Sequence, residues 1–483
     1  MKKLFFIFSL GFLVIICFFL FLFPRSQFPR TGQNIADAPN IVIYVIDTLR
    51  WDKVSAYGCP QSISPEIDYL SKQSTLYVNA FSTSCWTIPA HASLFTGLYS
   101  QQHQTNQLDI YLPDPKTTLA EKLKQAGYQT AAFVNNSLIG RNTNFLQGFD
   151  HAYEAFRDEE PQAVVPVQDP FKHDVLSTVV KWLHQYKPPE PYFIFINTIE
   201  PHLPYTAPHP FRKIFLSTAE AKKNWDHTYK MFAENFLKIK PFSDQWKAVM
   251  PKLYAAEVRF IDYHLGRFLR ELKLNRIGRE TLFILLSDHG ETLFQRHEYQ
   301  MDHQFHLHDE VIRIPLIINF PRYMSKNDMR LPKVSLIDIY PTIMHLIREP
   351  VQSEIRGKNL LAPDYGHELI FTEYYKPDFS VNYFFSQGYE LDDKYKCSLF
   401  SVQNDEFKMI KRTKGNDEFF DLKQDSAELN NLISMPHYEL KKNELSETYK
   451  SFRLLQAAEK SGTQPVQFDD KTKACLRELG YLQ

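Results

Sequence analysis

The sequence predicts an α/β fold in which a mostly parallel β-sheet is flanked by helices. Short apolar, β-branched runs without alternation are typical of strands buried on both faces of such a sheet. The chain has such runs at Ile41–Ile46, Ala131–Val134, Tyr192–Asn197, Thr281–Leu286 and Pro315–Phe320. Helical patterns lie between them, at Thr118–Ala126, Asp174–Gln185 and Tyr254–Leu272. Alternation of strands and helices over about 300 residues is typical of an α/β domain.

Length and composition agree with a globular protein of two or three structural units. The chain has 483 residues, of which 44% are hydrophobic and 23% charged, as in globular proteins. Lys and Arg number 55 against 56 Asp and Glu, so no basic excess points to nucleic acid and we expect no such partner. The chain has 5 cysteines, and no two lie three positions apart. This excludes a disulfide-rich scaffold and a Cys-x-x-Cys metal site.

The N-terminus predicts attachment to a membrane. Residues 4–23 are apolar except for one Ser and one Gly, and about 20 apolar residues suffice for a helix to cross a bilayer. The run is longer than a usual secretory signal and no small-x-small cleavage site follows. We therefore expect residues 1–23 to form an uncleaved signal anchor, with a cleaved signal peptide as the alternative, and residues 24–38 to form a linker. Lys2 and Lys3 favour a cytoplasmic N-terminus and an exported, periplasmic or extracytoplasmic, main domain.

A change of pattern divides the rest of the chain into a large domain at 39–362 and a smaller C-terminal subdomain at 363–483. The second part has short aromatic-rich runs that predict strands of a small antiparallel sheet. They are Leu369–Tyr375, Tyr383–Tyr389, Tyr395–Val402 and Phe407–Arg412, with a helix near Pro436–Glu459.

Two of the predicted strands of the large domain end directly in acidic or metal-capable residues. Ile41–Ile46 is followed by Asp47, and Thr281–Leu286 by Ser287-Asp288-His289. Ligands of parallel sheets bind just beyond the carboxyl ends of the strands. We therefore expect the chemistry of the protein at this edge, although an Asp after a strand often caps a helix or a turn.

One segment resembles the active-site signature of the sulfatases in the alkaline phosphatase superfamily. That signature has a Cys or Ser followed by x-Pro-x-Arg and, further on, Leu-x-Thr-Gly. The segment is Ser84-Cys-Trp-Thr-Ile-Pro-Ala-His-Ala-Ser-Leu-Phe-Thr-Gly97. Its last four residues match Leu-x-Thr-Gly, which puts Thr87 in the nucleophile position and His91 in the position of the Arg. Cys85 is not the cysteine that becomes formylglycine, because the residue two positions after it is Thr87 rather than Pro.

Further segments resemble the same family in the same order. They are Pro39–Asp52, Glu200–Tyr205, Leu286–Glu291, Leu307–Leu316, Val334–Thr342 and Glu418–Leu432. The chain is therefore identified as a member of this family. The resemblance implies an alkaline-phosphatase-like, mostly parallel sheet with a small C-terminal antiparallel sheet and a helix. One departure is Asp47-Thr48 in place of the usual Asp-Asp pair, which loses a metal ligand.

The resemblance implies a metal centre built from Asp47, Asp288, His289 and the hydroxyl of Thr87. Two carboxylates and an imidazole suit Zn²⁺ or Mn²⁺, and Ca²⁺ less well because it prefers six to eight oxygens. Coordination would make Thr87 an alkoxide nucleophile. Without the family context, Thr87 before Ile-Pro could also be a turn residue or a helix N-cap.

Three histidines are expected to assist Thr87. His202 and His303 are the candidate proton donors to the leaving oxygen, although His202 could instead pack passively. His91 lies where binding of a substrate oxygen is expected. His303 belongs to the His-rich stretch 297–308 and is favoured by its position before His308-Asp-Glu, with His297 and His306 of the same stretch as the alternatives. Elsewhere, Glu291 and Arg50 are expected to act around the metal ligands or structurally.

The single hydroxyl of Thr87 shapes the predicted function. A formylglycine carries a second hydroxyl that expels sulfate, whereas an ester on Thr must be broken by water or an alcohol. Threonine nucleophiles in this superfamily resemble those of nucleotide pyrophosphatase/phosphodiesterases, phosphonoacetate hydrolases, lipid A phosphoethanolamine transferases and lipoteichoic acid synthases. We therefore predict a metal-dependent hydrolase of phosphate, phosphonate or sulfate esters, acting on a small-molecule, lipid or glycan ester. The alternatives are an envelope transferase and a catalytically silent binding protein. The sequence does not indicate an oligomeric state.

Overall fold

The computed structural model describes most of the chain from residue 38 onward. The described range is 38–478, without 159–173, 186–189, 222, 224, 226–230, 232–233, 236, 238–239, 275–279, 297–300, 387 and 456–465. Within that range, no helix is both long and apolar enough to cross a bilayer. The predicted signal anchor and residues 24–37 of the predicted linker lie outside the described residues, so membrane attachment and export stay predictions.

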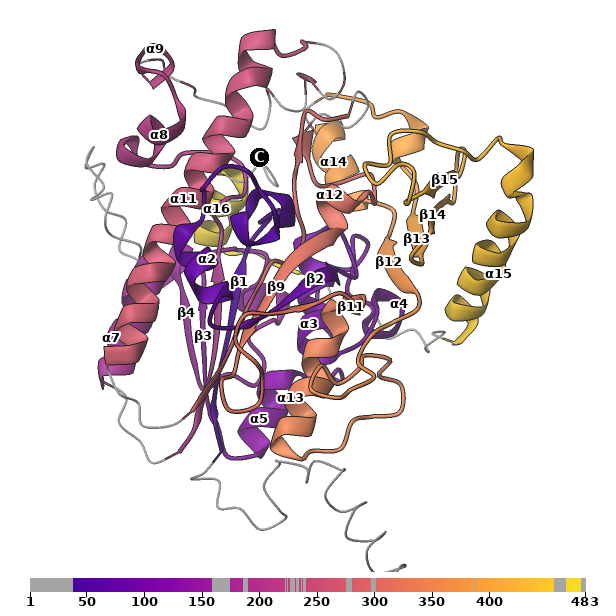
Figure 1. Cartoon of the computed structure of the whole chain (residues 1–483). Coiled ribbons are helices and arrows are strands. Elements are labelled where there is room, and N and C mark those ends of the chain that lie inside the picture. Colours follow the sequence, from indigo (N-terminus) through magenta and orange to yellow (C-terminus); the bar gives the residue numbers. More distant parts are fainter. Residues whose placement is uncertain are drawn as a thin grey trace, which may run out of the picture.

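A central sheet forms the middle layer of the large domain (Figure 1). Its strands stand in the order β10 (Asp328–Arg330), β2 (Thr75–Phe81), β9 (Arg313–Asn319), β6 (Thr281–Leu286), β1 (Asn40–Ile46), β5 (Tyr192–Thr198), β3 (Gln129–Val134) and β4 (His151–Glu154), and β11 (Val334–Ser335) pairs with β2. The pairings are parallel except for those of β9, which runs antiparallel to β2 and β6. The predicted mostly parallel sheet is confirmed.

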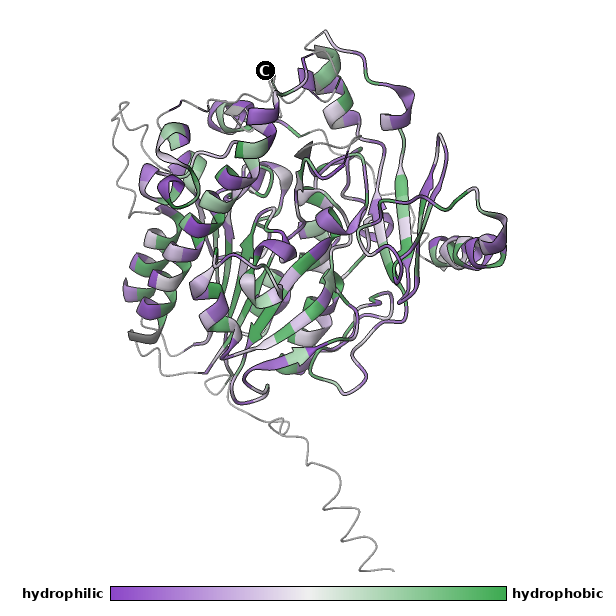
Figure 2. Cartoon of the chain, turned by 45° about the horizontal axis from the view of Figure 1, so that its top comes forward, coloured by the Kyte–Doolittle hydropathy of each residue, from purple (hydrophilic) through white to green (hydrophobic). Residues whose placement is uncertain are grey.

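Helices cover both faces of this sheet, which explains why its strands are apolar throughout. The odd-numbered side chains Ile41, Ile43 and Val45 pack toward α3 (Thr87–Thr96), α5 (Leu119–Gln125) and α13 (Ile339–Ile347). The even-numbered side chains of β1 pack toward α2 (Pro65–Ser71), α7 (Asp174–Gln185) and α11 (Asp244–Leu274). Figure 2 shows hydrophobic residues along the central strands between these helices. With both faces covered, alternation along a strand is not required.

Several other helices are nine residues long or shorter. They are α4 (Ser100–His103), α6 (Ala155–Asp158), α8 (His209–Phe215), α9 (Thr218–Ala221), α12 (Asp309–Ile312) and α16 (Asp470–Glu478). Single 3₁₀ turns lie at Trp51–Lys53, Ser55–Tyr57, Arg141–Thr143, Leu336–Asp338, Asp393–Tyr395 and Pro436–Tyr438.

The C-terminal part forms a second, antiparallel sheet. Its order is β12 (Ile370–Tyr374), β13 (Leu399–Gln403), β14 (Phe407–Arg412) and β15 (Glu418–Asp421), and α15 (Glu439–Leu455) follows. The small sheet and its helix are confirmed. The predicted strand at Tyr383–Tyr389 is wrong, because residues Asp378–Ser386 form helix α14. Phe384 packs into the core whereas its neighbour Phe385 is exposed, as expected when adjacent residues point to different sides of a helix. The boundary at 362/363 stays a prediction.

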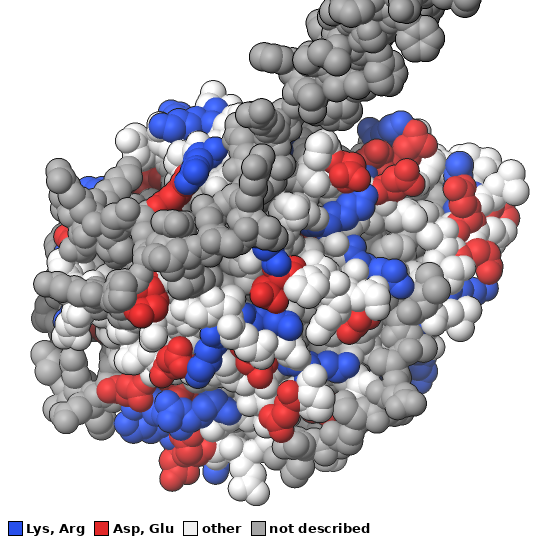
Figure 3. All heavy atoms as spheres, turned by 90° about the horizontal axis from the view of Figure 1, so that it is seen from below, with Lys and Arg blue, Asp and Glu red and all other residues white. Residues whose placement is uncertain are grey.

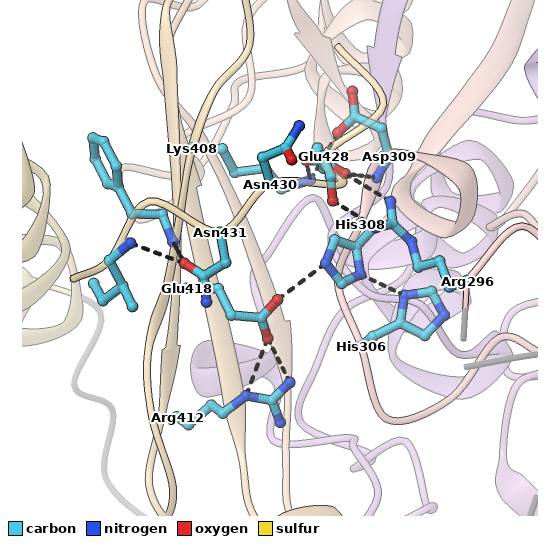
Figure 4. A network of polar contacts seen from close by, with 12 residues as sticks. Arg296, His306, His308, Asp309, Lys408, Arg412, Glu418, Glu428, Asn430 and Asn431 are labelled. Carbon is cyan, nitrogen blue, oxygen red and sulfur yellow. Dashed lines mark hydrogen bonds and ion pairs between the residues drawn. The ribbon is translucent and has the colours of Figure 1, made fainter. Parts of the chain in front are cut away.

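A network of charged and polar side chains joins this second sheet to the segment around α12 (Figure 4). His308 donates to Glu418 of β15 through Nε2 (3.1 Å), and its Nδ1 lies 3.1 Å from Nδ1 of His306. Lys408 of β14 is fully buried, and its ammonium lies 2.7 Å from Asp309 and 2.6 Å from Glu428. These contacts hold the segment after His303 against the C-terminal sheet.

Charges on the surface are mixed. On the face shown in Figure 3, Lys and Arg are interspersed with Asp and Glu. The described cysteines, Cys59, Cys85, Cys397 and Cys475, are free. Cys85 is buried beside the aromatic core, where burial raises the pKa of its thiol well above the ordinary value. It therefore stays a protonated, packed side chain, in line with its exclusion as a nucleophile.

Candidate active site

Asp47 lies where β1 ends, at the carboxyl edge of the parallel strands. The register that pairs Val45 with Leu286 puts the residues after β1 beside those after β6. The Asp47 side chain is fully buried, and its Oδ2 accepts a hydrogen bond from Nδ2 of Asn136 (2.7 Å). Its Oδ1 accepts none from the described residues. One oxygen is thus held in place while the other is available to a ligand.

Asp288 and His289 follow β6 and face Asp47. Oδ1 of Asp288 accepts from the backbone N–H groups of Thr48 (3.2 Å) and His289 (2.9 Å). Its Oδ2 has no hydrogen bond among the described residues and lies 3.4 Å from Nε2 of His289. Nδ1 of His289 donates to the carbonyl of Gly290 (3.0 Å). This hydrogen bond leaves Nε2 unprotonated, so its lone pair faces the carboxylates.

Thr87 is the first residue of helix α3, after the extended N-cap residue Trp86. Its side chain is fully buried, and its hydroxyl donates to Nε2 of His289 at 3.2 Å. The predicted nucleophile is therefore adjacent to the predicted metal ligands. The positive end of the helix dipole favours negative charge on an oxygen at this position.

The group Asp47, Asp288 and His289 fits a divalent cation. Each residue offers a ligand atom, and these atoms lie within 4.8 Å of one another. Burial, and then the nearby Asp288, raise the pKa of Asp47 well above its ordinary value. Two buried carboxylates with unsatisfied oxygens are costly without a counter-charge. Two oxygens, an unprotonated imidazole nitrogen and the Thr87 hydroxyl match the donor set of Zn²⁺ or Mn²⁺.

His91 lies one turn after Thr87 on the inner side of α3. Its Nδ1 donates to the Thr87 carbonyl (2.9 Å) and lies 3.6 Å from Oδ2 of Asp288. Its ring is fully buried, with Phe195 edge-on at 5.9 Å, and burial lowers its pKa. The structure thus places the His91 ring against the backbone of Thr87 and beside Asp288, a predicted metal ligand. Its role in binding a substrate oxygen stays a prediction.

His202 and His303 come together on the other side of His289. The ring centroid of His303 lies 4.3 Å from that of His289 and 5.3 Å from that of His202. Burial, followed by the nearby His303, lowers the pKa of His202 to about 3, which leaves this imidazole neutral at physiological pH. Burial also lowers the pKa of His303, but Asp302 and Glu291 outweigh it, so that the net shift is upward.

Several residues that support this site were not predicted. The amide of Asn136 holds Asp47, and Oδ1 of Asn197 accepts from the Asn136 backbone N–H (3.2 Å). The Tyr254 hydroxyl donates to the Thr48 carbonyl (2.8 Å), at a residue whose φ of 53° is left-handed. Only Asn197 left a signal in the sequence, as a polar residue at the end of an apolar strand run.

The remaining candidates have structural partners or lie outside the described residues. Arg50 binds Asp52 through two nitrogens (2.8 Å each) and donates to the Glu291 carbonyl (2.8 Å). It thus braces the loop after β6. His306 contacts Thr292 and His308, and His297 is not among the described residues.

Comparisons with known proteins place this site in a family. The family model described as Sulfatase matches residues 39–348, and the one described as N-sulphoglucosamine sulphohydrolase, C-terminal, matches residues 297–454. The ulvan-active sulfatase of Formosa agariphila is 24% identical over 439 residues, covering 86% of this chain and 80% of the relative. Arylsulfatase K of Mus musculus is 22% identical over 454 residues, covering 85% of this chain and 78% of the relative.

Solved structures share the fold. The phosphonate monoester hydrolase of Agrobacterium radiobacter superimposes with a TM-score of 0.67 at 18% identity, covering 86% of this chain and 96% of that structure. A structure in complex with its substrate D-glucosamine-2-N,6-O-disulfate gives a TM-score of 0.69 at 18% identity, covering 87% and 98%.

The matched region 39–348 makes up more than half of the chain and contains Asp47, Thr87, Asp288 and His289. The protein therefore belongs to the sulfatase family of metal-dependent ester hydrolases.

Proposed function

We propose that this protein hydrolyses a phosphate, phosphonate or sulfate ester through a covalent ester on Thr87. The observation that carries the proposal is the Thr87 hydroxyl 3.2 Å from Nε2 of His289, next to the unsatisfied Oδ2 of Asp288. A hydroxyl held among metal-ligand atoms at a helix N-terminus is suited to act as a nucleophile. The family relatives named as sulfatases and the fold relative named as a phosphonate monoester hydrolase support the reaction class.

The residues of this chain divide the reaction among them. Asp47, Asp288 and His289 would hold the divalent cation. When bound, this cation would lower the pKa of the Thr87 hydroxyl and counter the anionic charge of the substrate. Thr87 Oγ1 attacks sulfur or phosphorus, and the bond to the leaving alcohol breaks. Of the two histidines that border His289, His303, whose pKa is raised by Asp302 and Glu291, can supply the proton to the leaving oxygen. His202 is neutral at physiological pH and is not suited to that role. Water then cleaves the Thr87 ester, and the hydroxyl regains a proton.

The departure from formylglycine chemistry favours phosphorus as the reacting atom. Thr87 has one hydroxyl, so its ester has no internal group to expel the bound product. Phosphate and phosphonate esters are therefore the first choice for this site, and sulfate esters the second. An alcohol that takes the place of water would make the protein a transferase. A binding protein without activity would have no reason to keep an unsatisfied carboxylate beside a hydroxyl.

Labelled substrates test this proposal. The full chain, loaded with Zn²⁺ or Mn²⁺, is offered aryl sulfate, aryl phosphate, aryl phosphonate and aryl phosphodiester, and turnover is measured with and without an added alcohol. Because a sulfuryl and a phosphoryl group add nearly the same mass, ³⁵S- or ³²P-labelled substrate identifies the adduct. We expect the label on the peptide that contains Thr87, and ³²P more readily than ³⁵S.

Two variants give the controls. Thr87→Ala removes the nucleophile and is expected to abolish both labelling and turnover, whereas Thr87→Ser keeps a hydroxyl and retains part of both. Full activity of Thr87→Ala would show that another group attacks the substrate. Turnover that requires an alcohol acceptor would identify the protein as a transferase, and the absence of turnover with any of these esters would favour a binding protein.

A further inference from the structure

We propose that Glu291, Asp302 and His303 form a second divalent-cation site beside the first. This inference rests on the proposed function, because it adds a cation to the same catalytic centre. Each of the three side chains offers a ligand atom, and these atoms lie within 4.8 Å of one another. A carboxylate pair with one imidazole is a donor set that suits Zn²⁺ or Mn²⁺.

A short hairpin brings these residues together. Strand β7 (Thr292–Leu293) pairs antiparallel with β8 (Met301–Asp302), and Thr292 stands opposite Asp302. Glu291 directly precedes β7 and His303 directly follows β8, so both project from the same end of the hairpin. Nδ1 of His303 lies 3.2 Å from Oδ1 of Asp302 and 3.8 Å from Oε1 of Glu291. Ligand atoms that each lie about 2.0–2.2 Å from one tetrahedral cation are more than about 3 Å apart. The separations between these side-chain atoms are therefore of the size that a shared cation requires.

Buried polar atoms in this group have no hydrogen-bond partners. Glu291 is fully buried, and neither carboxylate oxygen accepts a hydrogen bond from the described residues. His303 is 2% exposed, and neither of its ring nitrogens has a hydrogen-bond partner among the described residues. Buried polar groups in native proteins are nearly always satisfied by protein, water or a bound ion. The nearby guanidinium of Arg50 binds both oxygens of Asp52 and the backbone carbonyl of Glu291, but it makes no hydrogen bond to the Glu291 carboxylate.

The two sites adjoin each other. The rings of His289 and His303 lie 4.3 Å apart at an interplanar angle of 34°, so one ligand of each site forms their common wall. Asp47, Asp288, Glu291 and Asp302 bring four carboxylates to this region, and two divalent cations would balance them. In two-metal centres, such a pair stabilises both the attacking and the leaving oxygen.

A third group of possible ligands nearby does not compete. His306, His308 and Glu310 also lie close enough to hold an ion. However, Arg296 already binds both oxygens of Glu310, and His308 donates to Glu418. A His303 that binds a cation cannot also protonate the leaving oxygen, and in that state the second cation would take over the stabilisation of the leaving oxygen.

Counting bound metal tests the inference without reference to activity. The full chain is stripped with a chelator, titrated with Zn²⁺, and measured by native mass spectrometry and elemental analysis. We expect two equivalents of Zn²⁺ in the natural protein, one in Glu291→Gln, one in Asp47→Asn and none in the double variant. Anomalous diffraction at the zinc edge would then show density between Glu291 and His303.

Matched variants separate this site from its surroundings. Glu310→Gln alters a buried glutamate that Arg296 already binds, and we expect it to keep both equivalents. Asp302→Asn, which changes a partly exposed side chain, replaces Glu291→Gln if the latter does not fold, and should also lose one equivalent. One equivalent in both the natural protein and Glu291→Gln would overturn the second site, with His303 protonated and paired with Glu291, and would leave the proposed function intact. No bound Zn²⁺ in the natural protein would overturn both.

Discussion

Asn136 allows a quantitative test of how the catalytic centre holds its metal. Its Nδ2 donates to Oδ2 of Asp47 at 2.7 Å in a fully buried position. A hydrogen bond to a charged group contributes about 1.5–3 kcal/mol. Asn136→Ala removes this donor and lets the Asp47 carboxylate turn away from the cation. Since about 1.4 kcal/mol is a factor of ten in an equilibrium constant, we expect the dissociation constant for Zn²⁺ to rise about 10–100-fold.

The assay is a titration of the metal-free chain with Zn²⁺ against a fluorescent chelator, with ester turnover followed in parallel. Repeating it in the Glu291→Gln background follows the Asp47 site alone. Because Asn136 acts through Asp47 rather than on the substrate, turnover should recover when Zn²⁺ is in excess. Turnover that stays low at saturating Zn²⁺ would show that Asn136 has another role.

Asn319→Ala is the matched control. Its Nδ2 donates to the carbonyl of Gln73 (2.6 Å) at the opposite end of the sheet. The Asn319→Ala substitution should lower the melting temperature of the protein without changing its affinity for Zn²⁺. An unchanged affinity in Asn136→Ala, with a melting temperature like that of the natural protein, would refute the reasoning.

Four other predictions concern stability and the surroundings of the site. Burial, and then Glu200, raise the pKa of Glu257 from 4.5 to about 8; between these pH values the unfolded chain releases a proton that the native one keeps. The free energy of unfolding should therefore fall by roughly 1 kcal/mol for each unit by which the pH rises through this range. In urea unfolding, Glu257→Gln should flatten this dependence on pH. Asp262 accepts from the first N–H groups of α2 at 2.8 and 3.1 Å, so Asp262→Ala should cost about 2–3 kcal/mol and Asp262→Asn less. A Cβ on Gly290 would lie 2.1 Å from the Glu310 carbonyl oxygen, so Gly290→Ala should displace His289 and lower kcat/KM about 100-fold. Cys85 should remain an unmodified thiol by peptide mass and react with iodoacetamide only after unfolding.

Distinct results would contradict each of these. A pH profile of Glu257→Gln that matches the natural one would mean that this carboxyl is ionised in the native state. Equal losses in Asp262→Ala and Asp262→Asn would point to packing rather than capping. A Gly290→Ala protein with normal turnover would show that the loop tolerates the displacement, and a converted or rapidly labelled Cys85 would contradict its burial.

Most of the central sheet could be predicted because its signal is local. A strand covered on both faces needs an uninterrupted apolar run, and β1, β5 and β6 have one. The strand β2 (Thr75–Phe81) was not predicted: its sequence Thr-Leu-Tyr-Val-Asn-Ala-Phe carries polar residues, and it owes its place to pairing with β9. The antiparallel direction of β9 likewise depends on contacts far apart in the chain.

The residues of the active site also divide into those that local sequence predicts and those that depend on tertiary contacts. Asp47, Thr87, Asp288 and His289 sit in motifs, so the sequence could nominate them before any contact was known. Asn136 lies in a loop after β3, and nothing in its neighbourhood marks it. It became visible through a hydrogen bond that spans 89 residues. Such supporting residues are specified by tertiary contacts, which one sequence read alone does not reveal.

We expect the buried bridge from Lys408 to Asp309 and Glu428 to set the order in which this enzyme becomes active. During synthesis, the nucleophile and the predicted ligands have all been made once His303 has been added. The segment that carries His303 still lacks its support, because Lys408 and Glu428 come more than a hundred residues later. A growing chain is therefore expected to stay silent until the C-terminal sheet has left the ribosome, and shortened translation products should be inert although every predicted catalytic residue is present.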